Sequence, residues 1–239
     1  MSDKRIGQAL ILGLFICLGL VLLGYFLSSG VTRIKALDRS VTVKGLSERE
    51  VPANIAIWPI KFSEAGNDLN ALFSTIQQKT SLVTQFLREN GFSENEISVS
   101  APAILDRQAQ GYVNSDKIKF RYSASAVITV YTTEVNTVRS SMKKLVELGK
   151  RGVAISGQDY ETKTQFLFTK LNEIKPGMVQ EATMNARKVA EKFAQDSKSR
   201  LGRIKRARQG QFSIANRDSN TPYIKRVRVV STLEYYLTD

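Results

Sequence analysis

The chain has 239 residues, of which 42% are hydrophobic and 24% charged, and its formal net charge is +13. This composition suits one good-sized globular domain or two small ones, and it favours anionic partners. Histidine is absent and Cys17 is the only cysteine, which excludes histidine acid–base chemistry, an intramolecular disulfide and the usual histidine or thiolate metal sites. We therefore expect no cofactor and no metal.

The first predicted element is an apolar helix. No charged residue occurs from Ile6 to Thr32, and the run ALILGLFICLGLVLLGYFL at 9–27 would rise about 28 Å as a helix, close to one hydrocarbon core. It is longer than the apolar part of a signal peptide, and FLSSGV is a poor cleavage site. A buried core helix is the alternative. We predict a membrane span over 6–29, with anchoring residues Ala9, Leu12, Phe15, Leu18, Leu22, Tyr25 and Leu27.

A short tail, 1–5, precedes this span, and a linker, 30–39, follows it. We expect one α+β domain over the remaining residues, 40–239. The positive charges in the two flanks are nearly balanced, so the positive-inside rule leaves the orientation open. These charges are Lys4, Arg5, Arg33, Lys35 and Arg39.

In the first half of the domain, strand signals frame one helix. A turn is predicted at 46–53 (LSEREVPA), and Pro59 indicates a bulge or a sheet edge. Apolar residues at helical spacing predict a helix over 68–90, closed by Gly91. Strands are predicted at 40–45, 54–62, 96–100 and, from strict alternation, 119–132.

In the second half, a short helix closed by Gly149 precedes a long one over about 176–200, with Pro176 in its first turn. Further strands are predicted at 153–157, 164–169, 203–214 and 225–237. The predicted inward stripe of the long helix is Ala182, Ala186, Val189, Phe193 and Ser197. The helix also carries an alanine at every fourth position: Ala182, Ala186, Ala190 and Ala194. These small side chains would let the helix lie close to a sheet. The alternative is that they form the contact between two helices of a dimer.

Helices separated by strand pairs predict an α+β fold, in which helices pack on a mixed, mostly antiparallel sheet. Four segments in this order resemble the bacterial SIMPL-domain family. They are 40–66, 86–100, 120–149 and 181–210. The chain departs from the family pattern in having one glycine in its first strand, an insert around Gly111–Lys117 and an unusually basic C-terminal half.

The resemblance implies an extracytoplasmic protein of Gram-negative-type bacteria, with its N-terminus inside the cell and its domain in the periplasm. Some relatives assemble as ring-like homo-oligomers, and some are linked to stress tolerance. The family has no established catalytic residues. The resemblance thus settles the orientation that the flanking charges leave open.

Catalytic candidates are few. Ser140 and Ser141 each stand three residues before a lysine, Lys143 and Lys144, a spacing that some nucleophilic enzymes use. We expect both serines on the surface, because Val138, Met142 and Leu145 form the inward stripe of their helix. Two acidic pairs lie in predicted turns, where nothing would raise a carboxyl pKa. They are Glu48 with Glu50 and Asp159 with Glu161. We predict that the protein is not an enzyme; a serine–lysine enzyme is the alternative.

Basic residues gather near the C-terminus. From Arg187 to Arg208, nine Lys and Arg face two acids, a net charge of +7. This run is a plain solvated face, a contact with anionic lipid, an envelope polyanion or another subunit, or a nucleic-acid site. Its only aromatic residue, Phe193, is predicted inward, and the KRARQ segment has basic residues on both strand faces; neither suits a one-faced nucleic-acid reader. The candidate contacts are Arg200, Arg203, Lys205, Arg206, Arg208, Lys225, Arg226 and Arg228.

We therefore expect a single-pass scaffold in the bacterial inner membrane. Its domain would lie in the periplasm, associate with other copies and serve envelope maintenance or stress tolerance. The alternative is a membrane-tethered cytoplasmic protein that binds nucleic acid through its basic C-terminal region.

Overall fold

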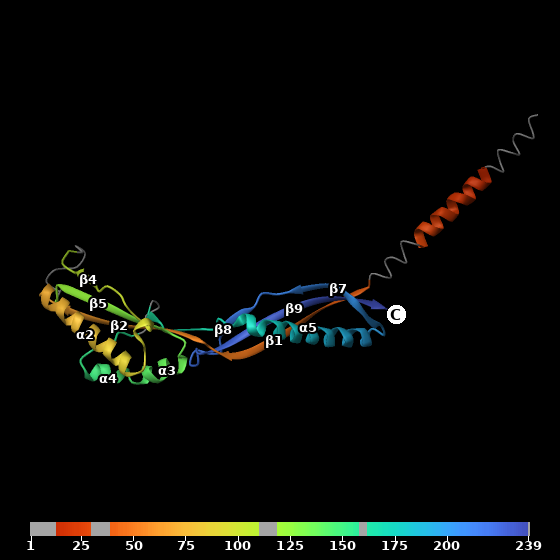
Figure 1. The fold of residues 1–239 in the computed structure, drawn as a ribbon. Coiled ribbons are helices and arrows are strands. Elements are labelled where there is room, and N and C mark those ends of the chain that lie inside the picture. The colour runs from red at the N-terminus through yellow and green to blue at the C-terminus, as the bar shows by residue number, and fades with distance from the viewer. Residues whose placement is uncertain (1–12, 30–38, 110–118, 158–161, 239) are drawn as a thin grey trace, which may run out of the picture. The chain divides into compact units, whose positions relative to one another are not determined.

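The computed structural model describes residues 13–29, 39–109, 119–157 and 162–238, and these divide into two compact units (Figure 1). Unit 1 comprises Met1–Glu48, Lys175–Phe212 and Arg228–Asp239. Unit 2 comprises Arg49–Ile174 and Ser213–Val227. The described residues form helices and antiparallel sheets, and this confirms the predicted α+β class.

Residues 13–29 form a helix with large apolar side chains exposed along its length. Five of the predicted anchoring residues lie on it and are exposed: Phe15, Leu18, Leu22, Tyr25 and Leu27. Ala9 and Leu12 lie outside the described residues. None of the helices in the described ranges combines the length and the apolar character needed to cross a membrane.

Unit 2 contains a five-stranded antiparallel sheet in the order β3-β5-β2-β6, with β4 also paired to β5. The strands are β2 (Ile55–Gly66), β3 (Ile97–Val99), β4 (Ala103–Asp106), β5 (Tyr122–Thr132) and β6 (Gln165–Leu167). The predicted 119–132 strand is thus confirmed as β5. In contrast, the predicted 153–157 strand is reduced to an isolated bridge between Ile155 and Phe62.

Pro59 pairs with Thr129 in unbroken register, so the predicted bulge is absent there. On the other side of β2, β6 pairs only with Ile55–Ile57, and the next bridge is at Phe62. Pro59 therefore lies between these two pairings, as on a sheet edge, where a residue without an N–H group breaks no ladder bond.

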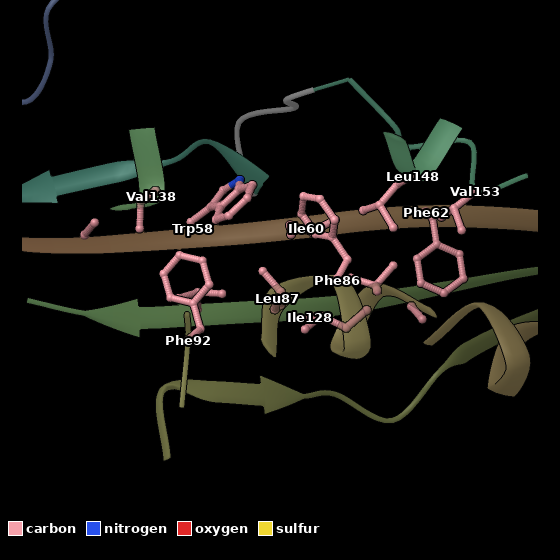
Figure 2. Packing of buried hydrophobic residues seen from close by; sticks show 14 of the residues in the cluster. Trp58, Ile60, Phe62, Phe86, Leu87, Phe92, Ile128, Val138, Leu148 and Val153 are labelled. Carbon is pink, nitrogen blue, oxygen red and sulfur yellow. The ribbon is translucent and has the colours of Figure 1, made fainter. Parts of the chain in front are cut away.

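Helices cover one face of this sheet. They are α2 (Leu69–Glu89), α3 (Val135–Lys143) and α4 (Leu145–Lys150), with a short 3₁₀ turn η1 (Glu94–Glu96) before β3. Asp68 caps α2 by accepting bonds from the N–H groups of Asn70 and Ala71, and Gly91 follows its end with φ of 93°. Figure 2 shows the core between the layers, where Trp58, Ile60, Phe62, Phe86, Leu87 and Ile128 meet.

Unit 1 pairs one helix with a sheet in the order β1-β9-β7. These elements are β1 (Ser40–Pro52), α5 (Leu171–Asp196), β7 (Arg200–Gln209) and β9 (Ile224–Thr238), and a short strand β8 (Ser213–Asn216) also pairs with β9. The predicted strand at 203–214 is therefore two strands. The helix begins five residues before Pro176, contrary to the predicted first-turn position, and it ends at Asp196.

The predicted turn at 46–53 is wrong, because β1 continues to Pro52 and only Ala53 and Asn54 precede β2. Of its polar residues, Glu48, Arg49 and Glu50 are all exposed. Ser47 faces inward, only 1% exposed, and donates a 2.9 Å hydrogen bond to the Glu181 carboxylate of α5. A polar run therefore marks a strand with a partly polar inner face.

The alanine repeat lies against the sheet, as predicted. Ala182, Ala186, Ala190 and Ala194 are at most 2% exposed. A Cβ added at Gly45 of β1 would lie 1.9 Å from the Ala182 carbonyl oxygen, so the helix and the strand approach too closely for any side chain there.

The predicted inward positions of Val189, Phe193 and Ser197 are wrong. Val189 and Phe193 are 42% and 55% exposed, and Ser197 is exposed beyond the end of α5. The buried line repeats every four residues, which rotates it by about 40° at each step of a 3.6-residue helix. The line thus follows the twisted sheet and moves away from the flank that carries Val189 and Phe193.

Candidate anion-binding site

Four of the predicted basic contacts share one face of the sheet in unit 1. Along β9, Val229, Leu233 and Tyr235 point inward, where Leu233 and Tyr235 pack with Ala186 and Ala190. The intervening residues point to the opposite, open face. Arg206 pairs with Glu234 and Arg208 with Thr232, so these arginines share that open face. The four residues are Lys205, Arg206, Arg208 and Arg228.

Irregular register lets consecutive basic residues face the same way. The β7–β9 register shifts between Leu201 and Ile204 and again between Ile204 and Arg206. Lys205 Nζ lies 3.4 Å from Glu234 Oε1 and 5.4 Å from the Tyr236 ring centroid, so this side chain also reaches the open face. The expectation that KRARQ divides its charges between two strand faces is therefore wrong, because bulges change the parity.

The open face is hollowed at its centre. Five side chains from β1, β9 and β7 line a hollow of about 230 Å³: Thr42, Thr232, Glu234, Arg206 and Arg208. Within the described ranges, neither arginine has an ion pair within 4 Å or a side-chain hydrogen bond. The site thus presents two uncommitted guanidinium groups beside two hydroxyls, the donors that bind phosphate and carboxylate oxygens.

Glu234 is the acidic member of the site. The Ser40 hydroxyl donates a 2.9 Å hydrogen bond to its Oε1 atom, and the Lys205 ammonium lies at 3.4 Å. The Ser40 bond, followed by Lys205 and Arg206, lowers the pKa of Glu234 below the ordinary glutamate value. The carboxylate is therefore charged at neutral pH and is already engaged by Lys205.

The other predicted contacts do not join this hollow. Arg200 and Arg203 are exposed near the start of β7. Lys225 belongs to unit 2, is 8% exposed and donates a hydrogen bond to the Asn216 side chain; burial lowers its pKa. Arg226 is exposed in unit 2. Lys225 and Arg226 are consecutive residues of β9, so their side chains point to opposite faces, and the lysine is the buried one.

The serine–lysine candidates do not form a pair. Ser140 is exposed and donates its hydroxyl to the Thr137 carbonyl at 2.9 Å. Ser141 is only 1% exposed, so its predicted surface position is wrong; it shares the inner side of α3 with Val138. Lys144 Nζ donates to Asn90 Oδ1 at 2.9 Å, away from either serine hydroxyl.

One acidic pair lies on an exposed stretch of β1, and the other lies outside the described residues. Glu50 contacts Arg217 at 3.4 Å in unit 2, whereas Glu48 lies in unit 1 on the same strand, which is not a turn. Asp159 and Glu161 lie outside the described residues, as does the Gly111–Lys117 insert. Among the residues that the structure describes, no three His, Cys, Asp or Glu side chains gather as metal ligands do.

Sequence reasoning missed Thr42, Thr232 and Glu234 as members of the site. The available signal was the alternation of β9 from Val227 to Tyr235, in which every second residue is apolar or small. That pattern places Thr232 and Glu234 with Arg228. The pattern does not show which strand pairs with β9. The membership of Thr42, which lies on β1, could therefore be found only from the structure.

Comparison with protein families gives a match to this chain. The family model SIMPL, described as a protein of unknown function (DUF541), matches residues 41–231. A search of curated proteins found no match. The matched segment contains all of unit 2, β1 from residue 41 onward, and Arg206, Arg208 and Arg228 of the open face, whereas Thr232 and Glu234 lie beyond its end. Since it covers more than half of the chain, this protein belongs to the SIMPL family.

Proposed function

We propose that the protein is a membrane-anchored, extracytoplasmic scaffold that associates with further copies of itself and serves envelope maintenance or stress tolerance. One observation carries the anchoring: the helix over 13–29 exposes apolar side chains in every direction. Leu20, Val21, Leu22 and Leu23 project at about 100° intervals and are each at least 49% exposed. A helix that is apolar all round needs lipid or a protein interior around it.

The scaffold role rests on what the folded part offers. Ser140 and Lys144 donate their hydrogen bonds to groups other than each other, and the open face of unit 1 presents donors for binding. The extracytoplasmic location and the association of copies rest on the resemblance to relatives described above. The N-terminus would then lie in the cytoplasm and both units in the periplasm.

Two arginines in the helix test the anchor. Leu18→Arg with Leu22→Arg would make insertion less favourable by about 6 kcal/mol, because each arginine at the centre of a span costs about 3 kcal/mol. We expect the wild-type chain to stay in carbonate-washed membranes and this variant to be released. Val189→Arg, at an exposed site in unit 1, is the matched control and should stay. Equal retention of all three would contradict the anchor.

Reporter fusions test the location. Alkaline phosphatase, which is active only outside the cytoplasm, should be active when fused after Asp239. An inactive fusion at normal expression would count against the periplasmic orientation. Mass measurement in mild detergent, with and without residues 1–35, tests association; a monomer in both forms would exclude the scaffold as proposed.

A second candidate function is nucleic-acid binding by a membrane-tethered protein. The exposure of Phe193 favours it, because an exposed aromatic ring on a helix that also carries exposed Arg187 and Lys192 offers both stacking and phosphate contacts for a single strand. This candidate predicts affinity for DNA or RNA that falls steeply with salt. Phe193→Ala should then weaken binding; binding unchanged by salt would exclude this candidate.

A further inference from the structure

The open face of the sheet in unit 1 carries cations on the three neighbouring strands β1, β9 and β7. Lys44 of β1 is on the same strand face as Thr42, since both alternate with the buried Val43. Arg228 of β9 has the parity of Thr232 and Glu234, and Arg206 and Arg208 come from β7. Within the described residues, these four side chains have no salt bridge. The face is therefore a cationic surface built across three strands.

We propose that this face binds the phosphate groups of anionic lipid headgroups, in the membrane that holds the helix over 13–29. The inference rests on the proposed anchoring and names the partner of the anion-binding site. The partner is the lipid surface itself, which the scaffold would contact with one defined side of unit 1.

The chemistry of the hollow suits a phosphate oxygen cluster. Guanidinium groups bind phosphate through paired N–H donors, and Arg206 and Arg208 both line the same hollow. The Thr42 and Thr232 hydroxyls supply further donors there. Glu234 opposes an anion, but Lys205 lies against its carboxylate and offsets that charge. The remaining charge in the hollow is positive.

The spread of the cations favours a surface over a single small anion. Four unpaired cations lie on three neighbouring strands, whereas one phosphate ion fits at the central hollow only. A surface with many phosphate groups contacts all four cations together. Each basic residue near an anionic membrane strengthens attachment about five-fold, so the four act multiplicatively.

Chain length also places the site within reach of lipid. The helix ends at residue 29 and β1 starts at Ser40, so ten residues, 30–39, join them. Their extended length is at most about 37 Å, which holds the open face at a high effective concentration of headgroups once the helix is inserted.

The experiment uses the full chain in uncharged detergent micelles. Its probes are short-chain phosphatidylglycerol, short-chain phosphatidylcholine, inorganic phosphate and a single-stranded oligonucleotide. Binding is measured by titration at about 0.15 M salt, where the Debye length is about 8 Å. We expect phosphatidylglycerol to bind, and Arg206→Gln with Arg208→Gln to weaken it about 30-fold. Glu234→Gln should strengthen it about five-fold, because it removes the opposing charge.

The matched control is Arg187→Gln with Lys188→Gln, which removes the same charge from exposed positions of α5, on the other side of the sheet. We expect it to bind phosphatidylglycerol as the wild type does. Equal weakening in both double variants would overturn the proposal, since net charge alone would then explain binding. Equal binding of phosphatidylcholine would overturn it too.

Two further outcomes would assign the site to another source. Inorganic phosphate that binds as tightly as phosphatidylglycerol, with the same loss in the arginine variant, would overturn the lipid assignment in favour of free phosphate. Tighter binding of the oligonucleotide would overturn it in favour of nucleic acid. Flotation of the full chain with phosphatidylcholine vesicles tests the helix separately, so failure of the anchor is distinguished from failure of the face.

Discussion

At Gly45, the backbone of α5 lies very close to the backbone of β1. A Cβ at this position would be 1.9 Å from the Ala182 carbonyl oxygen and 2.4 Å from the Ala186 amide nitrogen. Because both are backbone atoms, the helix itself would have to shift. We expect Gly45→Ala to destabilise unit 1 by about 2–4 kcal/mol. Amide hydrogen exchange in α5 and β9 measures this loss.

Gly149 is the matched control. It lies in α4, where an added Cβ meets no atom within 4 Å. Gly149→Ala should be neutral or stabilise by up to about 1 kcal/mol, because alanine is the better helix former. Similar exchange in the two variants would contradict the close packing of β1 against α5.

The buried hydroxyl of Tyr235 destabilises the core of unit 1. Its side chain is 1% exposed, and its hydroxyl has no hydrogen-bond partner among the described residues. A buried polar group without a partner costs about 1–3 kcal/mol. We expect Tyr235→Phe to leave stability unchanged or raise it by about 1 kcal/mol. A clear loss of stability, measured by amide exchange in β9, would show that the hydroxyl does have a partner.

At the scale of elements, the question for α5 is which of its residues face the sheet: the alanine line found in the structure or the predicted stripe that includes Phe193. The structure buries Ala190 completely and leaves Phe193 55% exposed. Ala190→Leu should therefore destabilise unit 1 by about 1–3 kcal/mol through overpacking. Phe193→Ala should change stability by less than about 1 kcal/mol. The inward stripe predicted from sequence places Phe193 in the core, where its truncation would cost about 3–5 kcal/mol, so urea unfolding of Phe193→Ala distinguishes the two interpretations.

Two strands show when a sequence pattern is enough to predict a strand and when it is not. In β5, Ala124, Ala126, Ile128 and Val130 alternate with polar residues, and the structure confirms the strand because period two directly reports one buried face. The second half of β1 breaks this alternation, since Glu48, Arg49 and Glu50 are all exposed and its buried residue is the polar Ser47, which bonds to Glu181. Its strand character depends on a partner more than 130 residues away, so a local pattern predicts a turn.

The candidate site shows the same limit. The basic run and the final strand were evident from the sequence, and Arg206, Arg208 and Arg228 do share a face. Two register shifts in β7 decide which face each residue takes; Gly202 is a bulge signal at the first shift, but the second, between Ile204 and Arg206, has no glycine or proline to signal it. The order β1-β9-β7 brings Thr42 to the site from the far end of the chain. Long-range pairing of this kind is set by tertiary packing, which period and propensity do not report.

At the scale of the whole molecule, the two units differ in their cores. In the described residues, the main buried cluster of unit 2 contains nineteen side chains, among them Trp58, Phe62 and Phe86. The cluster of unit 1 contains five, of which two are alanines. Because apolar burial is the main favourable term in folding, unit 1 has the weaker core. Its stability depends more on the close approach of α5 and the sheet.

This difference predicts separate unfolding transitions for the full chain in uncharged detergent. Trp58 is the only tryptophan, is 1% exposed and belongs to unit 2, so its fluorescence follows that unit. Amide exchange in α5 and β7 follows unit 1. We expect unit 1 to open at the lower urea concentration, and Gly45→Ala to move its transition while the fluorescence midpoint stays. Coincident midpoints that shift together would mean that the strands β1 and β9, which each contribute to both units, couple them into one cooperative fold.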